Sequence, residues 1–380
     1  MRVLHLVPGN LFGGVETFIA FLARRGELSP DLEHHFALCF SGRLAEAIRA
    51  AGAPLHELES VRISRPWTLR RGRRRLADLL AQTVFDVAVT HGSWAHAMFA
   101  PVLARAGVPN VFYLHGPINE VMWLDRWAML NVPKVMVGVS RDTLATGRLL
   151  FADVAAEVLN YPIPDAFGTG ATERERVRAE LGARADDTIL FQASRVERWK
   201  GHDRLLDALG MLRTLPGWTC WLAGGTQRPH ERAFLDELKR QVSRLGLEQR
   251  VKFLGERRDV PRLLSGADVY CQANVGGEGF SLAFMEAFAA GRPIVTTRLG
   301  GAGELIDDAT GVLVPPGDTA AFAAALRRLI EHPEERRAMG ERARDRVWHV
   351  SDPAARMRDL ARILQAARAS AGSGPLQAAG

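Results

Sequence analysis

Residues 276–286 read Gly276-Gly277-Glu278-Gly279-Phe280-Ser281-Leu282-Ala283-Phe284-Met285-Glu286, and this stretch predicts a loop that runs into a helix. The three glycines permit backbone angles that other residues avoid, and Ser281 is a favourable N-cap. Glu278 therefore stays in the loop, while Glu286 lies on the helix itself. Two carboxylates are thus held on either side of a helix start.

The predicted helix has one apolar face, which we expect to be buried. This face holds Leu282, Met285, Phe288 and Ala289. Gly291 is a typical residue just beyond a helix C-terminus, so the helix ends near residue 290. Glu286 lies beside the buried face, on the flank of the helix.

Such a helix start suits a diphosphate that is linked to a sugar. Free N–H groups near Ser281 and the positive end of the helix dipole attract a pyrophosphate. Carboxylates only accept hydrogen bonds, so Glu278 is suited to the hydroxyls of a hexose and Glu286 to those of a ribose. The alternative is an ordinary capped helix with a surface glutamate at each end.

The composition is that of a soluble globular protein. The chain has 380 residues, 47% of them hydrophobic and 24% charged, which predicts two or three domains. Its three cysteines, Cys39, Cys220 and Cys271, are far apart and predict buried thiols in a reducing compartment. No secretory signal and no membrane-spanning run is recognisable, so we expect a cytoplasmic protein.

The charge is positive and unevenly distributed. The formal net charge of +6 favours anionic partners. Five arginines crowd the segment Arg70–Arg75, whose helical pattern has apolar residues on one face. This segment predicts peripheral attachment to an anionic membrane surface, and a solvated basic helix face remains the alternative.

The first part of the chain alternates strand-like and helical runs, the pattern of parallel βαβ units. The expected strands are 3–7, 35–40, 54–58, 86–90, 110–114, 135–139 and 157–160. A helix is expected at 119–129 among others. The turn after the first strand carries Gly13 and Gly14 but lacks the Gly-x-Gly-x-x-Gly spacing, which argues against NAD or FAD.

A segment rich in Pro, Gly and small residues, 161–172, reads as a linker to a second domain. Strands are then expected at 189–193, 219–223, 251–254, 269–272, 294–297 and 311–314, again separated by helices. The predicted fold class is therefore α/β, with two Rossmann-like doubly wound domains, 1–165 and 173–350, that face a central cleft. Ligands of parallel sheets bind beyond the carboxyl ends of the strands.

One strand of the second half ends in Ser194-Arg195-Val196-Glu197-Arg198-Trp199-Lys200-Gly201. This places Arg195 and Lys200 at a strand tip, where we expect the Glu278 loop to lie as well. Two cations there are suited to neutralising a diphosphate, since Arg can bond two oxygens and Lys acts as a point charge. The alternative is a surface salt bridge between Arg195 and Glu197.

These motifs together resemble the retaining glycosyltransferases of the GT-B fold, family 4. The resemblance spans nearly the whole chain and rests mainly on the Arg195 and Lys200 pair and on the Glu278-Gly-Phe-Ser and Glu286 signature. It implies a donor that is a nucleotide-diphosphate sugar, most often a UDP-sugar, held mainly by the second domain. It also implies that the final helix, 353–369, packs back on the first domain.

The resemblance assigns roles to individual residues. It implies that Arg195 and Lys200 contact the diphosphate, and that Glu286 contacts the ribose. The remaining donor-binding positions that it implies are Gly13, Gly14, Leu254, Glu278, Phe280, Ser281 and Leu282. His115 matches the family's cleft histidine, so the expected catalytic group is His115, Glu278, Arg195 and Lys200. His91 and His96 are weaker candidates for the acceptor side.

The resemblance further implies transfer with retention of configuration and without a bound metal. Consistent with this, no Asp-x-Asp pair follows a strand, so cationic side chains and a helix terminus would take over the electrostatic role of a metal. The acceptor would be a saccharide, a lipid-linked molecule or a small metabolite, in cell-surface glycan or glycoconjugate synthesis.

Two other functions remain open from the sequence. An epimerase or phosphorylase of the same architecture would bind a related phosphate, although the paired glutamates favour transfer. A noncatalytic protein that binds sugar nucleotides or nucleic acid would suit the basic charge. Because no aromatic and basic RNA platform or recognition helix is recognisable, we expect no nucleic-acid partner.

Overall fold

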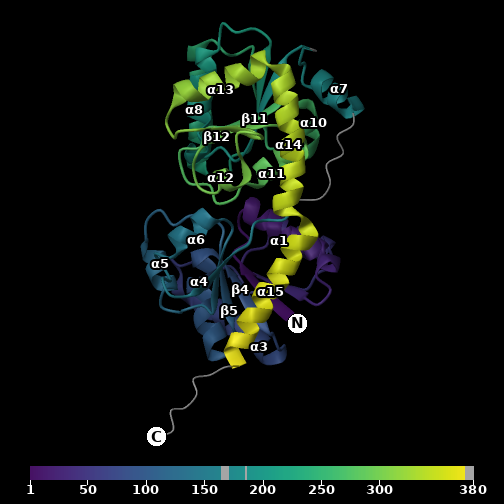
Figure 1. Ribbon diagram of the computed structural model, residues 1–380. Coiled ribbons are helices and arrows are strands. Elements are labelled where there is room, and N and C mark those ends of the chain that lie inside the picture. Colours follow the sequence, from purple (N-terminus) through teal and green to yellow (C-terminus); the bar gives the residue numbers. More distant parts are fainter. Residues whose placement is uncertain (164–170, 185, 373–380) are drawn as a thin grey trace. The chain divides into compact units, whose positions relative to one another are not determined.

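The computed structural model describes residues 1–163, 171–184 and 186–372, and Figure 1 labels some of their helices and strands. The chain divides into two compact units, Met1–Pro164 with Pro353–Gly380, and Asp165–Asp352. Residues 164–170 of the predicted linker lie outside the described residues.

The first unit is built on a sheet of seven parallel strands in the order β3-β2-β1-β4-β5-β6-β7. The strands are β1 Arg2–Val7, β2 Glu33–Leu38, β3 Leu55–Glu57, β4 Val87–His91, β5 Asn110–Leu114, β6 Val135–Gly138 and β7 Ala155–Val158. The helices are α1 Gly14–Arg24, η1 Gly26–Leu28 (a 3₁₀ turn), α2 Arg43–Ala50, α3 Pro66–Gln82, α4 Gly92–Arg105, α5 Trp123–Ala128 and α6 Arg141–Gly147. The central strands β4 and β5 are buried along their whole length, as expected for parallel strands covered on both faces.

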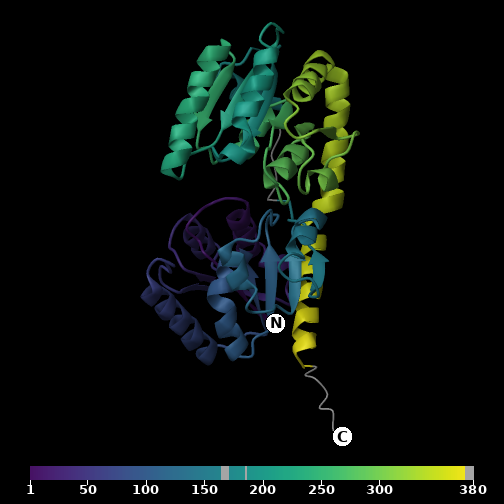
Figure 2. The ribbon, with the colours of Figure 1, turned by 90° about the vertical axis from the view of Figure 1, so that its left-hand side faces the viewer.

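The last helix of the chain, α15 Pro353–Gly372, belongs to this first unit. It contacts β4, β5 and η1, and Figures 1 and 2 show it in yellow beside the blue strands. Its buried side chains, Met357, Leu360, Ile363, Leu364 and Ala367, recur at helical spacing. Ion pairs from Arg362 to Glu157 (3.2 Å) and from Arg368 to Asp86 (3.1 Å) fix its outer face.

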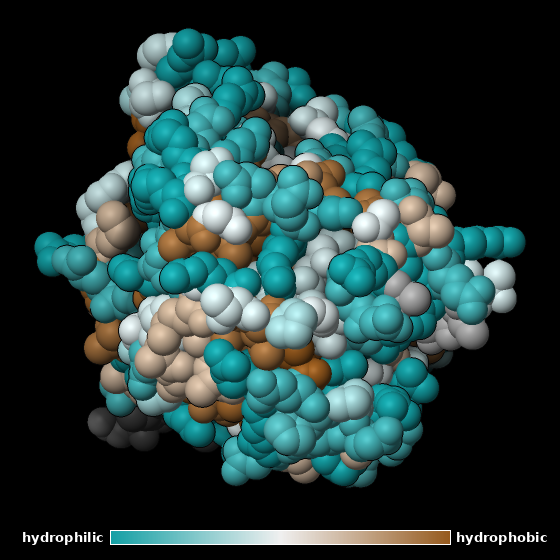
Figure 3. All heavy atoms as spheres, turned by 90° about the horizontal axis from the view of Figure 1, so that it is seen from above, coloured by the Kyte–Doolittle hydropathy of each residue, from teal (hydrophilic) through white to brown (hydrophobic). Residues whose placement is uncertain are grey.

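The second unit has six parallel strands in the order β10-β9-β8-β11-β12-β13. The strands are β8 Thr188–Ala193, β9 Trp218–Ala223, β10 Val251–Gly255, β11 Val269–Gln272, β12 Ile294–Thr297 and β13 Gly311–Val314. The helices are α7 Ala171–Glu180, η2 Arg198–Lys200 (3₁₀), α8 His202–Met211, α9 Pro229–Leu245, α10 Val260–Gly266, α11 Leu282–Ala289, α12 Ala302–Leu305, α13 Thr319–Glu331 and α14 Pro333–Ser351. The surface seen in Figure 3 is mainly hydrophilic, as expected where residues face water.

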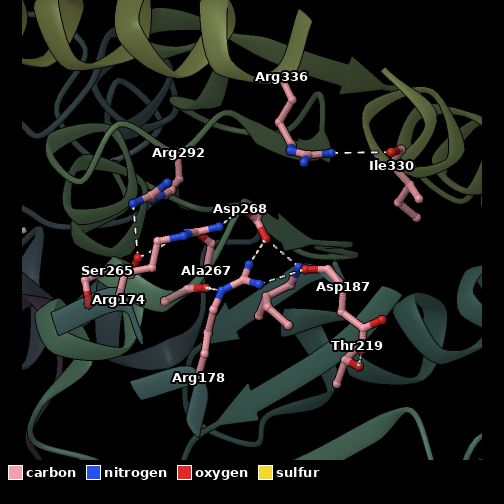
Figure 4. A network of polar contacts seen from close by, with 12 residues as sticks. Arg174, Arg178, Asp187, Thr219, Ser265, Ala267, Asp268, Arg292, Ile330 and Arg336 are labelled. Atoms are coloured by element: carbon pink, nitrogen blue, oxygen red, sulfur yellow. Dashed lines mark hydrogen bonds and ion pairs between the residues drawn. The ribbon is translucent and has the colours of Figure 1, made fainter. Parts of the chain in front are cut away.

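A buried carboxylate, Asp268, joins helix α7 to the amino-terminal ends of β8 and β11 (Figure 4). It accepts from Arg174 (2.6 Å), Arg178 (2.5 Å) and the N–H of Ile189 (2.7 Å). The same arginines donate to carbonyls at the C-terminal end of α10, where the helix dipole is negative. Polar contacts therefore hold α7 in place.

Helix α7 was not predicted, and the reason lies in these contacts. Its sequence has almost no apolar face. Among the side chains of α7 that the structure describes, Val177 is the hydrophobic one that is fully buried. The predicted linker 161–172 thus extends too far, because Ala171 already begins a helix. Strand β2 starts two residues before the predicted position, and α5 is shorter than predicted because Asp125 accepts from the N–H of Met122 and closes the helix start there.

Candidate functional site

Three loops meet at the carboxyl ends of β8, β11 and β12 in the second unit. Gly201 has a φ of +66°, and a Cβ there would lie 1.6 Å from the carbonyl oxygen of Ala273. Gly300 has a φ of +56°, and a Cβ there would lie 1.8 Å from the carbonyl oxygen of Glu278. Only glycine permits these two approaches, because they combine positive φ with backbone contact. The glycines therefore bring the Lys200 loop and the Glu278 loop together.

Lys200 and Glu278 form an ion pair in this site. The distance from Nζ to Oε2 is 2.5 Å, and each side chain is 13% exposed. Gln272 also donates to Oε2 of Glu278 (3.3 Å), and the Lys200 ammonium lies 3.9 Å from the ring centre of Trp199. The carbonyl of Trp199 accepts from the N–H of Val275, which ties the two loops together (3.0 Å). Lys200, the predicted diphosphate contact, and Glu278, the predicted sugar contact, are thus direct neighbours.

The N-terminus of α11 lies on the same loop. Ser281 is its N-cap residue, but the Ser281 side chain makes no capping hydrogen bond. Among the described residues no acceptor faces the N–H groups of Leu282 and Ala283. These donors, at the positive end of the helix dipole, are available to an anion.

Glu286 is half-buried on α11 and has no hydrogen-bond donor among the residues that the structure describes. Burial raises its pKa to about 7, because the charged carboxylate loses hydration that nothing replaces. Near neutral pH the side chain is therefore divided between its acid and carboxylate forms. The buried face of the helix holds Phe284 and Met285, while Leu282 is only half-buried, so the predicted apolar face was partly wrong.

Arg195 has acidic partners on its own side of the site. Its guanidinium pairs with Glu197 (3.0 Å) and lies 3.9 Å from Glu231. Glu197 also accepts from the indole N–H of Trp199 (3.0 Å), which connects Arg195 to the Lys200 loop. From the sequence, this salt bridge to Glu197 was the alternative to a role of Arg195 in binding a diphosphate. The nitrogen that faces Glu231, Nη1, is buried and has no hydrogen-bond partner among the residues that the structure describes.

A cavity of about 200 Å³ opens next to this loop, at the ends of β8, β9 and β10. It is lined by Val196, His202, Leu222, Ala223, Gly224, Leu235, Lys239, Phe253 and Gly255. Burial lowers the pKa of His202 to about 4, so that its ring is neutral. Leu254, which the resemblance implies as a donor-binding position, is not among the lining residues and falls where the β10 register shifts, between Phe253 and Gly255.

Sequence reasoning missed Gln272, Trp199, His202 and Lys239. Gln272 offered a signal, since a glutamine that ends a buried apolar strand needs polar partners. His202 also offered a signal, because it directly follows Lys200 and Gly201 in the sequence. Lys239 offered none, because it lies on a helix that is remote in sequence.

In the first unit, the predicted residues occupy the carboxyl ends of β1 and β5. Gly13 caps α1, and its N–H donates to Glu16 (2.9 Å), while Gly14 begins the helix. His115 is half-buried, and burial lowers its pKa to about 3. Its Nδ1 bonds to the hydroxyl of Tyr161 (2.6 Å) and its Nε2 to His91 (2.8 Å). Both ring nitrogens are therefore occupied, so a ligand can bond to the ring only by displacing a partner.

His96, a weaker candidate, has a structural environment. Its Nδ1 lies 2.8 Å from the hydroxyl of Thr90, and its Nε2 lies 2.7 Å from the carbonyl oxygen of Asn131. The side chain is fully buried in the core. We therefore assign His96 to packing rather than to acceptor binding.

The basic segment Arg70–Arg75 lies on α3 and is only partly directed to solvent. Arg73 donates to the carbonyls of Met98 (2.7 Å) and Ala97 (3.1 Å). Arg75 pairs with Glu59 (2.7 Å). None of the described helices is both long and apolar enough to cross a bilayer.

Comparison with known proteins identifies the family. Residues 173–346 match the family described as Glycosyl transferases group 1. The chain is 32% identical to a glycogen synthase of Mycobacterium tuberculosis over 332 residues, which cover 81% of this chain and 77% of that protein. The chain belongs to the glycosyl transferases group 1 family.

This glycosyltransferase also resembles two mannosyltransferases. It is 27% identical over 380 residues to a GDP-mannose-dependent alpha-(1-6)-phosphatidylinositol monomannoside mannosyltransferase of Mycolicibacterium smegmatis, covering 93% of this chain and 94% of the other. It is 35% identical over 153 residues to a phosphatidyl-myo-inositol mannosyltransferase of Mycobacterium leprae, a match that spans 39% of this chain and 38% of that protein.

Solved structures show the fold of the glycosyltransferase. HepE of Anabaena in complex with UDP-glucose has a TM-score of 0.85 at 23% identity, covering 96% of this chain and 100% of that one. WaaG, a glycosyltransferase involved in lipopolysaccharide biosynthesis, has a TM-score of 0.70 at 17% identity, covering 96% and 99%. The predicted family and the predicted GT-B class, with two parallel Rossmann-like sheets, are confirmed.

Proposed function

We propose that this glycosyltransferase moves a sugar from a UDP-sugar to a hydroxyl of a saccharide, lipid-linked or small-molecule acceptor, with retention of configuration and without a metal. The second unit holds the donor and the first unit holds the acceptor. The observation that carries this proposal is the Lys200–Glu278 pair beside the uncapped start of α11 and the unpartnered Glu286. A role in cell-surface glycan synthesis follows as part of the same proposal.

Donor binding is an exchange of partners. The diphosphate takes the Lys200 ammonium and the N–H groups at the start of α11, and Glu278 is released to accept from hydroxyls of the sugar. Arg195 turns its Nη1, which lies 3.9 Å from Glu231 and makes no hydrogen bond among the described residues, to the same phosphates. Glu286 accepts from the ribose hydroxyls, which supply the hydrogen bonds that its carboxylate lacks.

In the transfer step the bond from the anomeric carbon to the phosphate oxygen breaks, and a bond to the acceptor oxygen forms on the same face. The leaving phosphate takes the proton of the acceptor hydroxyl. Lys200, Arg195 and the α11 N-terminus stabilise the charge that develops on the diphosphate, which is the electrostatic contribution expected from preorganised donors.

The base of the donor is assigned to the cavity beside Val196. Its 200 Å³ corresponds to about six or seven water molecules, less than a complete ligand pocket and suited to a base alone. The relatives name different donors, GDP-mannose for the mannosyltransferase and UDP-glucose for HepE. GDP-mannose is therefore the competing donor.

A donor screen tests this proposal. The protein is incubated with UDP-glucose, GDP-mannose or ADP-glucose, each with EDTA or with Mg²⁺, and release of the nucleoside diphosphate is measured without acceptor. We expect slow hydrolysis of one donor that EDTA does not change. Retention is then checked by the NMR coupling of the anomeric proton in a transfer product. Loss of activity in EDTA would refute the metal-free mechanism, and binding of no sugar nucleotide would refute the donor site.

We also propose that the enzyme acts in the cytoplasm and attaches to anionic membranes through Arg70–Arg75. Arg70 and Arg74 are exposed and have no ion pair among the described residues, and Trp67 nearby is 57% exposed. Cosedimentation with vesicles that contain anionic lipid should fall in the R70E/R74E variant. The R240E/R244E variant, with the same spacing on α9, is the matched control, and equal loss in both variants would refute the proposal.

A further inference from the structure

A chain of hydrogen bonds crosses the first unit and ends at His115. Its members, in order, are Ser29, His34, His5, His91, His115 and Tyr161. The three nitrogen-to-nitrogen distances between rings are 2.9, 3.0 and 2.8 Å. The hydroxyls at the two ends lie 3.2 Å (Ser29) and 2.6 Å (Tyr161) from the nearest ring nitrogen.

The sheet topology places the four rings side by side. They come from β2, β1, β4 and the residue after β5, which are consecutive neighbours in the sheet. The rings of His91 and His115 are stacked, with an interplanar angle of 16° and centroids 5.0 Å apart. His5 is stacked on His91 in the same way, at 29° and 5.3 Å. The chain is thus a row across four adjacent strands.

All four rings are neutral at ordinary pH. Burial lowers the pKa of His34 to about 4 and that of His115 to about 3. The pKa values of His5 and His91 are lowered well below the usual value, again chiefly by burial. A neutral imidazole has one N–H donor and one acceptor nitrogen. Each ring therefore donates on one side and accepts on the other.

We infer that the four histidines form one coupled unit in which all rings share a single tautomer, so that His5, His34 and His91 are positioning residues that set the tautomer of His115. Every contact between rings joins an Nε2 to an Nδ1. An N–H must meet a lone pair at each contact, and the choice made at one ring fixes the next. Only two arrangements satisfy all three contacts, Nε2–H in every ring or Nδ1–H in every ring.

The tautomer also fixes the hydroxyl of Tyr161. In the Nε2–H arrangement this hydroxyl donates to His115, and Ser29 accepts from His34 at the other end. In the Nδ1–H arrangement His115 donates to the hydroxyl oxygen of Tyr161, so the hydroxyl proton of Tyr161 points away from His115. Ser29 therefore influences, through three rings, which hydrogen bonds the His115 side can offer. Any effect on transfer rests on the catalytic role that the family resemblance implies for His115, whereas the coupling itself does not.

Nitrogen NMR of the complete protein, labelled with ¹⁵N in its histidine rings, tests the coupling without substrate. Ring ¹⁵N chemical shifts distinguish the two tautomers. His96 is an internal reference: the carbonyl of Asn131 only accepts, so His96 must be Nε2–H in every sample. In the wild type we expect His5, His34, His91 and His115 to show the same tautomer or the same average of the two.

Two end variants should set opposite directions. Ser29→Ala leaves the Nε2 of His34 without a partner, and because a buried unpaired N–H is costly, all four rings should become Nδ1–H. Tyr161→Phe removes the partner of the Nδ1 of His115 and should favour Nε2–H throughout. Rings that divide between tautomers in any of the three proteins, or a His115 tautomer that is the same in both variants, would overturn the inference.

Discussion

Glu286→Gln should separate the cost of burying a charge from the role of Glu286 in binding. The folded-state pKa of about 7 compares with 4.5 for an ordinary glutamate. Between pH 4.5 and about pH 7 the folded state therefore keeps a proton on Glu286 that the unfolded state has lost. The free energy of unfolding falls as pH rises through this range. At about 1.4 kcal/mol per pH unit, the loss is about 3 kcal/mol and is complete above pH 7.

Glutamine cannot ionise, so the variant should lack this loss. By urea denaturation, Glu286→Gln should match the wild type within about 1 kcal/mol near pH 4.5 and exceed it by about 3 kcal/mol at pH 8. Glu341→Gln, an exposed position on α14 in the same unit, should differ from the wild type equally at both pH values. A Glu286→Gln difference that does not depend on pH would refute the reasoning.

Nucleotide binding should respond in the opposite sense. Ribose hydroxyls donate to the ionised carboxylate, so the affinity of the wild type for UDP or GDP should rise with pH up to about 7 and then level off. Isothermal titration calorimetry between pH 5.5 and 8 measures this slope. In Glu286→Gln the slope due to this group should vanish, and an unchanged slope would place the nucleotide away from Glu286.

Three other substitutions test separate parts of the second unit. Lys200→Met removes a charge-assisted contact worth about 1.5–3 kcal/mol and should weaken UDP-sugar binding by about tenfold to a hundredfold in calorimetry. Arg204→Met on α8 is the control and should not weaken binding. Equal binding by both variants would contradict the contact between Lys200 and the diphosphate. Asp268→Asn leaves Arg178 and its neighbour Arg174 without their carboxylate and should lower the free energy of unfolding, measured by urea denaturation, by about 3–5 kcal/mol. The exposed Glu237→Gln should lower it by under about 1 kcal/mol. Similar small losses in both variants would refute the role of the Asp268 network. Gly300→Ala should abolish donor hydrolysis while the circular dichroism spectrum is kept, because its Cβ would meet the Glu278 carbonyl at 1.8 Å; normal hydrolysis would show that the loops need not approach so closely.

Much of the fold follows from hydrophobic pattern, because the strands of a parallel sheet are buried on both faces and stand out as short apolar runs. Val269–Gln272, Ile294–Thr297 and Gly311–Val314 have the predicted bounds. Helix α7 escaped detection for the converse reason. Its contacts with Asp268 are polar and join positions about ninety residues apart, which no local pattern records.

The candidate site was predictable to the extent that its residues lie on motifs. Glycine spacing and a strand tip were enough to indicate Lys200 and Glu278, and the structure places them in contact. The partner of Arg195 depends on competition among acidic side chains, and Glu231 comes from a distant helix. The occupied ring of His115 depends on residues from other strands. Contacts of this kind are decided by tertiary packing.

These competing contacts indicate how the donor site achieves selectivity. In the free protein Lys200 and Arg195 are already paired with carboxylates, so a diphosphate gains only the difference between its own contacts and those it replaces. A simple anion such as phosphate can displace Glu278 from Lys200 but supplies no hydroxyl in return, so the carboxylate keeps only the long hydrogen bond from Gln272 (3.3 Å) among the donors described above, in a site where its side chain is 13% exposed. A sugar nucleotide supplies hydroxyls to Glu278 and Glu286 as well as charge to Lys200. The paired state of the free site therefore favours ligands that carry a diphosphate and hydroxyl groups together over ligands that carry charge alone.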